Sequence, residues 1–208
     1  MKIRFLWQRK KNVCFKGCWK KKEYKIKSIG IAGSIRGSGV THLSVALANY
    51  AASGLGEKTA CLELNGHGEL SHWKECNCNG YFSDFGVHYY PEFKKEQIPV
   101  FMTRNYQKVI MDFGDAYWKF REELLRCDGK IFLLNINPWQ EFAIKKMLHT
   151  MADESWGSIE AVYCSRTMQK SEKRKIEKTL KNNKYRYMYN WNTLLYTWNW
   201  HSIVSEIQ

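Results

Sequence analysis

Short apolar runs recur along the middle of the chain, separated by longer segments in which apolar residues return every three or four positions. The short runs are continuous, as in strands that are buried on both faces of a parallel sheet. They predict strands at residues 27–32, 58–64, 108–112, 130–136 and 159–164. Residues 85–90 predict one further strand, at an edge of the sheet, which Pro91 ends.

The longer segments between these strands have the apolar spacing of amphipathic helices. They predict helices at residues 41–53, 116–127, 140–151 and 171–181. Gly54 and Gly56 are placed to end the first helix, and Pro138 stands at the start of the third. Residues 66–80 are polar and are expected to form a loop or a short helix. Strands alternating with helices predict an α/β fold of three layers, with a mostly parallel sheet flanked by helices.

Composition narrows the class of protein further. The chain has 208 residues, of which 44% are hydrophobic, so one α/β domain with a proper core is expected. The seven cysteines are odd in number, and Cys61 and Cys164 lie in apolar runs, which favours reduced thiols over disulfides. The sequence contains neither an apolar run long enough to span a membrane nor a secretory signal. A cytoplasmic protein is therefore expected, with peripheral contact at the inner face of the membrane as an option.

The chain divides by charge into a basic leader at residues 1–26 and an expected folded domain at residues 27–208. The leader contains one acid, Glu23, and places Trp7 and Trp19 among its lysines and arginines. Together with a formal net charge of +13, this composition suits an acidic lipid surface, a nucleic-acid backbone or an acidic protein partner. A solvated tail that aids solubility explains the leader equally well.

Basic and aromatic residues are also combined near the C-terminus. The basic residues are Lys170, Lys173, Arg174, Lys175, Lys178, Lys181 and Lys184, and the aromatic residues that follow are Tyr185, Tyr187, Tyr189, Trp191, Tyr196, Trp198 and Trp200. Such a mixture can contact a nucleic acid or a membrane interface. A solvated helix followed by a tail that packs into the core is the simpler interpretation, and we favour it.

Histidines and cysteines gather in the polar segment after the second predicted strand, as His67, His72, Cys76 and Cys78. A structural zinc site needs four converging ligands. The spacing of these four residues matches no strong zinc-binding pattern. A polar loop with incidental thiols is therefore the expected interpretation.

A glycine-rich turn links the first predicted strand to the first predicted helix, with the sequence Gly33-Ser34-Ile35-Arg36-Gly37-Ser38-Gly39-Val40-Thr41. In this context the pattern G-x-x-x-x-G-K-[ST] holds phosphate through backbone N–H groups and a lysine. Gly39 and Thr41 match its second glycine and its hydroxyl, whereas Ser34 replaces the first glycine and Val40 replaces the lysine. The residues expected to hold a nucleotide are Arg36, Gly37, Ser38, Gly39, Val40 and Thr41. A tight turn in which Thr41 only caps the helix is the alternative.

Asp112 closes the apolar strand at residues 108–112. An acid at the end of a strand downstream of a phosphate-binding loop commonly holds the magnesium ion of the bound nucleotide. Thr41 and Asp112 are therefore the predicted magnesium ligands, with ATP or ADP as the cofactor. Taken by itself, Asp112 is explained equally well as a turn or cap residue.

The phosphate-binding loop, the acid Asp112, and Glu63 and Asn65 after the second strand resemble the MinD/ParA/CpsD branch of P-loop NTPases. The resemblance covers residues 27–164 and implies the three-layer P-loop NTPase fold, ATP or ADP with magnesium, and a homodimer. Within the branch, the chain is most similar to the TadZ/CpaE-like proteins, which help to place a pilus assembly machine. A pilus or secretion system is therefore the implied partner.

The departures from this family change the expected activity. Val40 and Ile35 stand where the family has its two loop lysines, and Glu63 and Asn65 stand where it has two aspartates. Loss of one charge-stabilising group raises a reaction barrier by roughly 3–4 kcal/mol. We therefore expect a degenerate ATPase domain, slow or inactive, that acts as a localisation or assembly factor. One alternative is an active ATPase that uses Arg36 and Glu63, the candidate catalytic residue, in place of the missing groups; the other is a basic nucleic-acid-binding module.

Overall fold

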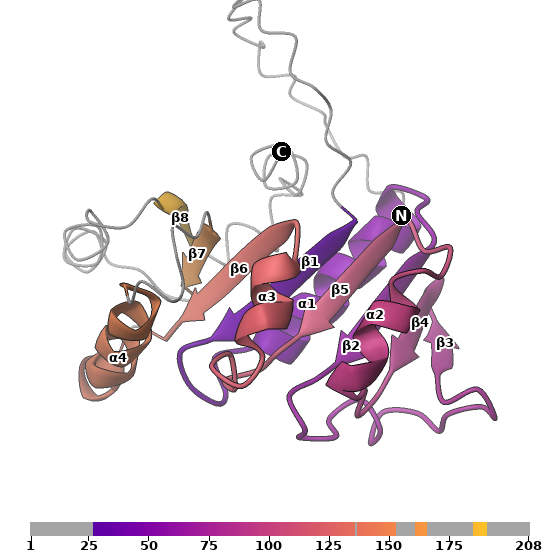
Figure 1. The fold of residues 1–208 in the computed structure, drawn as a ribbon, viewed down its shortest axis with the longest axis horizontal. Helices are drawn as coiled ribbons and strands as arrows, with labels where there is room; N and C mark the ends of the chain where they lie inside the picture. Colours follow the sequence, from indigo (N-terminus) through magenta and orange to yellow (C-terminus); the bar gives the residue numbers. More distant parts are fainter. Residues whose placement is uncertain (1–26, 136, 153–160, 166–184, 191–208) are drawn as a thin grey trace, which may run out of the picture.

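The computed structural model describes residues 27–135, 137–152, 161–165 and 185–190. Within this part of the chain, eight strands form one sheet in the order β3-β4-β2-β5-β1-β6-β7-β8 (Figure 1). The strands are β1 Ser28–Gly33, β2 Thr59–Glu63, β3 Phe82–Asp84, β4 Val87–Tyr90, β5 Lys108–Asp112, β6 Gly129–Leu134, β7 Ala161–Ser165 and β8 Tyr185–Asn190. All neighbours pair in parallel except β3, which is antiparallel to β4.

Helices cover both faces of the sheet (Figure 1). They are α1 Val40–Asn49, which continues as the π-helical turn Tyr50–Gly54, the short helices α2 Ile98–Phe101 and α3 Arg121–Arg126, and α4 Glu141–Ala152. Two further helical turns, Lys95–Gln97 and Pro138–Gln140, precede α2 and α4. The helices α2, α3 and α4 lie on the face opposite α1, so the three-layer α/β architecture predicted from the alternation of strands and helices is confirmed.

The core has one apolar cluster on each face of the sheet. On the α1 face, Leu43 and Leu47 pack with strand residues such as Ile31. On the other face, Leu124 of α3 and Met147 of α4 belong to the second cluster. Successive strand residues point to opposite faces, so strands buried on both faces need continuous apolar sequence. This requirement explains why the short apolar runs predicted the strands.

The central strand β1 positions the candidate site. It pairs with β5 on one side, where Ile31 lies opposite Asp112, and with β6 on the other, where Gly33 lies opposite Leu133. Because these three strands are parallel, their carboxyl ends meet at one edge of the sheet. The glycine-rich turn after β1 therefore lies between the segments that follow β5 and β6.

The central strand predictions are confirmed to within two residues, and β5 has the predicted bounds at both ends. The strand predicted at 85–90 is present as β4, which ends before Pro91 as expected, but its predicted start and its edge position are wrong. Phe85 and Gly86 have φ angles of 46° and 79° and form the turn between β3 and β4. The edge strand is β3, and β4 pairs on both sides. The strand β8 was not predicted. The basic leader and the helix predicted at 171–181 lie outside the described residues.

The helix predicted at 116–127 is also wrong in its first half. Helix α3 begins at Arg121, and the preceding residues form turns in which the Lys119 N–H donates to the Ala116 carbonyl. Ala116 and Tyr117 are buried in these turns, which gives the segment its helix-like apolar spacing without a helix.

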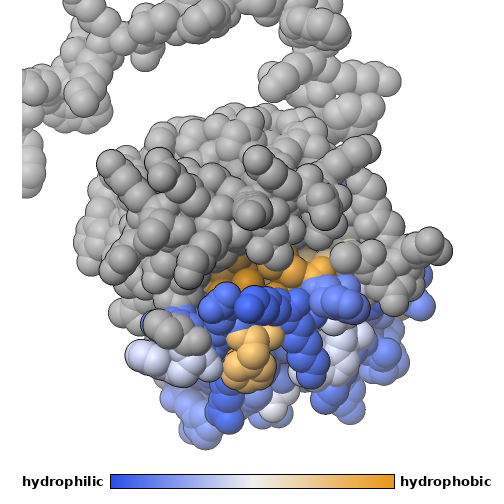
Figure 2. Space-filling view, turned by 90° about the vertical axis from the view of Figure 1, so that its left-hand side faces the viewer, coloured by the Kyte–Doolittle hydropathy of each residue, from blue (hydrophilic) through white to orange (hydrophobic). Residues whose placement is uncertain are grey.

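Six large apolar side chains of the described residues are exposed: Trp73, Phe85, Val100, Trp118, Trp139 and Phe142. Figure 2 views the side on which α4 lies, where hydrophilic residues surround small apolar areas. Trp139 and Phe142, at the start of this helical segment, are 73% and 67% exposed. Among the described residues, no helix is long and apolar enough to cross a membrane.

Candidate phosphate-loop site

The turn after β1 has the backbone conformation of a phosphate-binding loop. Gly37 and Gly39 have φ angles of 78° and 95°, in the left-handed region that favours glycine, and Gly39 is the N-cap of α1. The Ser38 N–H donates to the Ile35 carbonyl at 3.3 Å. Within the described chain, the N–H groups of Gly37 and Gly39 make no backbone hydrogen bond. The N–H groups of Gly37 and Gly39 are therefore available to hold an anion at the start of α1.

The base of the loop is bonded to both neighbouring strand ends. The Gly33 N–H donates to the Gly114 carbonyl at 2.7 Å, and the Ser34 N–H donates to the Leu133 carbonyl at 2.9 Å. Ser34 Oγ also accepts the N–H of Asn135 at 3.3 Å. The loop is thus built on three adjacent strands rather than on β1 alone.

Val40, which stands in the lysine position, joins the apolar core on the α1 face and is 5% exposed. Its Cγ2 atom would lie 2.8 Å from a Cβ atom added to Gly33, and Ser38 Oγ would lie 2.0 Å from the same atom. Position 33 must therefore remain glycine for the side chains of Ser38 and Val40 to pack there. No positive charge comes from position 40.

Asp112 lies at the carboxyl end of β5 and is fully buried. Its Oδ1 atom accepts the N–H of Gly114 at 2.9 Å, and its Oδ2 atom has no hydrogen-bond partner among the described residues. Burial raises the pKa of Asp112 from 3.8 to about 6, although the nearby side chains of Thr41 and Asn65 and the Gly114 N–H act to lower it. An orphaned, buried carboxylate oxygen beside a threonine hydroxyl is the donor set that Mg²⁺ takes.

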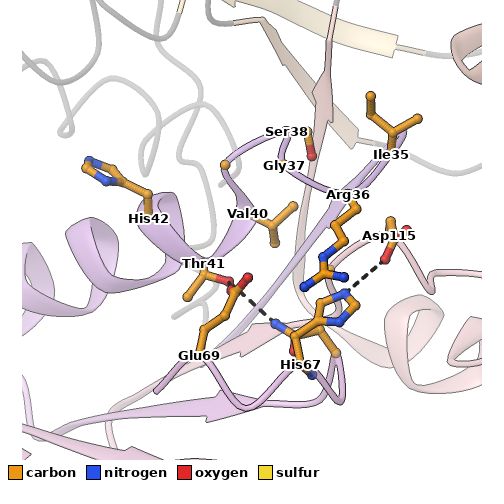
Figure 3. A pocket seen from close by; sticks show the side chains of 13 residues that line it. Ile35, Arg36, Gly37, Ser38, Val40, Thr41, His42, His67, Glu69 and Asp115 are labelled. Carbon is orange, nitrogen blue, oxygen red and sulfur yellow. Dashed lines mark hydrogen bonds and ion pairs between the residues drawn. The ribbon is translucent and has the colours of Figure 1, made fainter. Parts of the chain in front are cut away.

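The hydroxyl of Thr41 has a partner within the chain. Thr41 Oγ1 donates to Glu69 Oε2 at 2.5 Å, and Asn65 Nδ2 donates to Thr41 Oγ1 at 3.4 Å (Figure 3). Glu69 belongs to the loop after β2, so it reaches Thr41 from an element that lies two strands away from β1. A carboxylate thus contacts the hydroxyl that a P-loop offers to magnesium.

Glu63, the candidate catalytic residue, is buried and bonded to the backbone. Its carboxylate accepts the N–H groups of Glu69 at 2.7 Å, of Leu70 at 3.3 Å and of Glu92 at 3.3 Å. Burial raises the pKa of Glu63, and these three hydrogen bonds act to lower it. Because Glu63 does not line the cavity described next, its contacts are those of a residue that holds the loop after β2 in place.

A cavity of about 220 Å³ opens beside the loop. Its lining consists of Ile35, Arg36, Gly37, Ser38, Gly39, Val40, Thr41, His42, Asn65, His67, Glu69, Gly114 and Asp115. His67 Nε2 lies 3.3 Å from Asp115 Oδ1, and the side chain of Arg36 points toward this pair (Figure 3). The cavity therefore carries the cationic Arg36 together with the carboxylates of Glu69 and Asp115.

The sequence predicts the loop residues Arg36 to Thr41 of this cavity but not His67, Glu69 and Asp115. These three residues follow the carboxyl ends of β2 and β5, which are neighbours in the sheet. That position was the available signal, since ligands of open α/β sheets bind outside the carboxyl ends of the strands. Among the described residues, no three His, Cys, Asp or Glu side chains gather as a metal site.

The strand order, the left-handed glycines of the loop and the acid ending β5 together define the fold of the MinD/ParA P-loop ATPases. No family model matches the sequence, and no curated protein matches it. Among solved structures, a putative plasmid partition protein from Borrelia burgdorferi bound to AMPPNP is 13% identical, with a TM-score of 0.57. The alignment covers 88% of this chain and 97% of that one.

Two further solved structures have the same fold. MinD from Aquifex aeolicus is 14% identical with a TM-score of 0.52, over 81% of this chain and 84% of that one. Cobyrinic acid a,c-diamide synthase from Mycobacterium smegmatis, bound to an ATP analogue and magnesium, is 11% identical with a TM-score of 0.54, over 76% and 82%. At these identities the similarity shows the fold alone.

Proposed function

We propose that this chain is a degenerate MinD/ParA-like P-loop domain that acts as a localisation or assembly factor, with weak or absent ATP hydrolysis. The observation that carries the proposal is the burial of Val40 in the apolar core at the lysine position. With Ile35 at the second lysine position, the loop lacks both charges that would stabilise a transferring phosphoryl group. A loop that has the backbone conformation of a phosphate-binding loop but lacks both lysine charges suits a scaffold protein better than a fast enzyme.

The residues fit a nucleotide in part. The N–H groups of Gly37 and Gly39 suit phosphate oxygens, and the oxygens of Thr41 and Asp112 suit Mg²⁺. A bound nucleotide would place its negatively charged phosphates in this loop. Hydrolysis would cleave the bond to its terminal phosphate. Solved structures of the fold have been obtained with AMPPNP and with ADP and magnesium, which supports nucleotide binding in this chain as part of the proposal.

The partners belong to the proposal as well. MinD from Aquifex aeolicus has been solved in a complex with MinC, which supports protein partnership as the output of this fold. For this chain we propose a homodimer at the cytoplasmic face of the membrane, working with a pilus or secretion system. The net charge of +13 suits both an acidic partner and an acidic lipid surface.

A steady-state phosphate-release assay on the full chain tests the lack of turnover. We expect wild type with ATP and Mg²⁺ to release no phosphate above buffer, and the Asp112→Ala variant to give the same result. Release that is robust in wild type and vanishes in Asp112→Ala would overturn the proposal and favour the active ATPase. Arg36→Ala and Glu63→Gln would then show whether these residues replace the missing groups.

A further inference from the structure

The loop after β2 is held in a defined position beside the phosphate-binding loop. Asn65 Oδ1 accepts the N–H of His67 at 2.8 Å, and the buried carboxylate of Glu63 accepts the N–H groups of Glu69 and Leu70. The Leu70 side chain is 2% exposed and packs into the core on the α1 face. The backbone of Glu69 is therefore fixed on both sides, and its side chain is directed into the cavity.

The Glu69 carboxylate contacts the cavity where a nucleotide phosphate and its metal would lie. Its Oε2 atom accepts the Thr41 hydroxyl at 2.5 Å, and this hydroxyl belongs to the first turn of α1 (Figure 3). Gly37 and Gly39 line the same cavity, and their N–H groups make no backbone hydrogen bond among the described residues. A negative charge of the chain itself thus stands beside groups that otherwise attract the negative charge of phosphate.

We infer that Glu69 is a specificity-determining residue that competes with nucleotide for this loop, so that polyphosphates bind only weakly while its charge is in place. The inference deepens the proposed function and rests on it, because it takes the cavity to be an eroded nucleotide site. Glu69 is exposed, so solvent screens its charge. Repulsion between this carboxylate and a terminal phosphate at about 4–5 Å then weakens binding by about tenfold.

Neutralising Glu69 without changing its size tests the competition. ADP and AMPPNP, each with Mg²⁺, are titrated calorimetrically into the full chain as wild type, Glu69→Gln and Glu69→Asp. Glu69→Gln keeps an oxygen for the Thr41 hydroxyl and loses the charge, so its Kd should be about tenfold lower than that of wild type. Glu69→Asp keeps the charge and should stay within about threefold of wild type.

Two additional variants separate charge from structure. Glu96→Gln removes an exposed carboxylate in the turn before α2, away from the cavity, and should bind as wild type does. Glu69→Ala removes the charge and the Thr41 contact together, and it should also bind more tightly. Thermal melting of each variant shows that it is folded at the titration temperature.

The inference is overturned if Glu69→Gln and Glu69→Ala bind no more tightly than wild type, or if none of the proteins binds either nucleotide. These outcomes are distinct from failure of the proposed function. Phosphate release that depends on Asp112 would refute the lack of turnover, whatever the ratio of the Kd values. An unchanged Kd in an inactive protein would refute only the role of Glu69.

Discussion

Asp112→Asn is expected to stabilise the fold at neutral pH, because keeping the buried Asp112 carboxylate ionised lowers the free energy of unfolding. Burial raises its pKa from 3.8 to about 6. At about 1.4 kcal/mol per pKa unit, this difference corresponds to about 3 kcal/mol of unfolding free energy. The amide keeps an oxygen for the Gly114 N–H and removes the charge that burial disfavours.

The sign follows from which state holds the proton. Because the pKa of Asp112 is higher in the folded chain, the folded state keeps its proton between about pH 4 and pH 6 while the unfolded state releases it. The contribution of Asp112 to stability therefore falls as the pH rises through this window. The full cost is present above it, at about pH 7.5, and is absent below about pH 4.

Urea unfolding of wild type and Asp112→Asn at about pH 4.5 and pH 7.5 measures the effect. The advantage of the variant should grow by about 2 kcal/mol between the two conditions. Taking the difference between the proteins at each pH removes the titration of all other groups. Glu96→Gln, an exposed acid changed to its amide, should follow wild type at both pH values.

A pH-independent difference would show that the Asp112 carboxyl is ionised as easily in the folded chain as in the unfolded one. If the free energy of unfolding of the variant falls relative to that of wild type as the pH rises, the folded state stabilises the charge of Asp112 instead of disfavouring it. Either result would refute the reasoning that joins burial, the orphaned Oδ2 atom and a site built for a cation.

Other predictions concern the packing around the site. Gly114→Ala should cost about 2 kcal/mol in thermal unfolding, since its φ is 55° and the added Cβ would lie 2.5 Å from Cβ of Asn65. Gly37→Ala, with a φ of 78° but no atom within 4 Å of the added Cβ, should cost about 1 kcal/mol. Equal costs for the two variants would contradict the clash between position 114 and Asn65. Phe132→Ala, at a fully buried position, should cost about 3–5 kcal/mol in urea unfolding. Phe142→Ala, at a position that is 67% exposed, should change the free energy of unfolding by less than about 0.5 kcal/mol. A loss as large as that of Phe132→Ala would contradict the burial assigned to these two residues.

The central strands β1, β2, β5 and β6 were predictable because they are buried on both faces, which requires a nearly continuous apolar run in the sequence. The residues around Tyr117 were not, because a buried turn and a helix can produce the same apolar spacing. The hairpin of β3 and β4 was hidden for a related reason. Phe85 adopts a positive φ in the turn, which residues other than glycine rarely do, so the apolar pattern predicts a strand that begins at Phe85 instead of a turn there.

The sequence also predicts only part of the candidate site. The loop residues are contiguous, so their pattern and their neighbours in the sequence predicted them. The contacts of Thr41 with Glu69 and of His67 with Asp115 span 28 and 48 residues, and no local pattern encodes them. The family resemblance makes Glu63 a candidate catalytic residue because it stands at an aspartate position of the family, whereas the described fold uses its carboxylate to accept backbone N–H groups.

The hydrogen bonds at the base of the loop couple it mechanically to its neighbours. Gly33 is bonded to Gly114 and Ser34 to Leu133, so neither neighbouring backbone can shift without breaking a bond or moving the loop. Trp118 and Trp139, which are 54% and 73% exposed, lie a few residues beyond these two anchors. A shift of either neighbouring segment is therefore passed to the loop through these two hydrogen bonds.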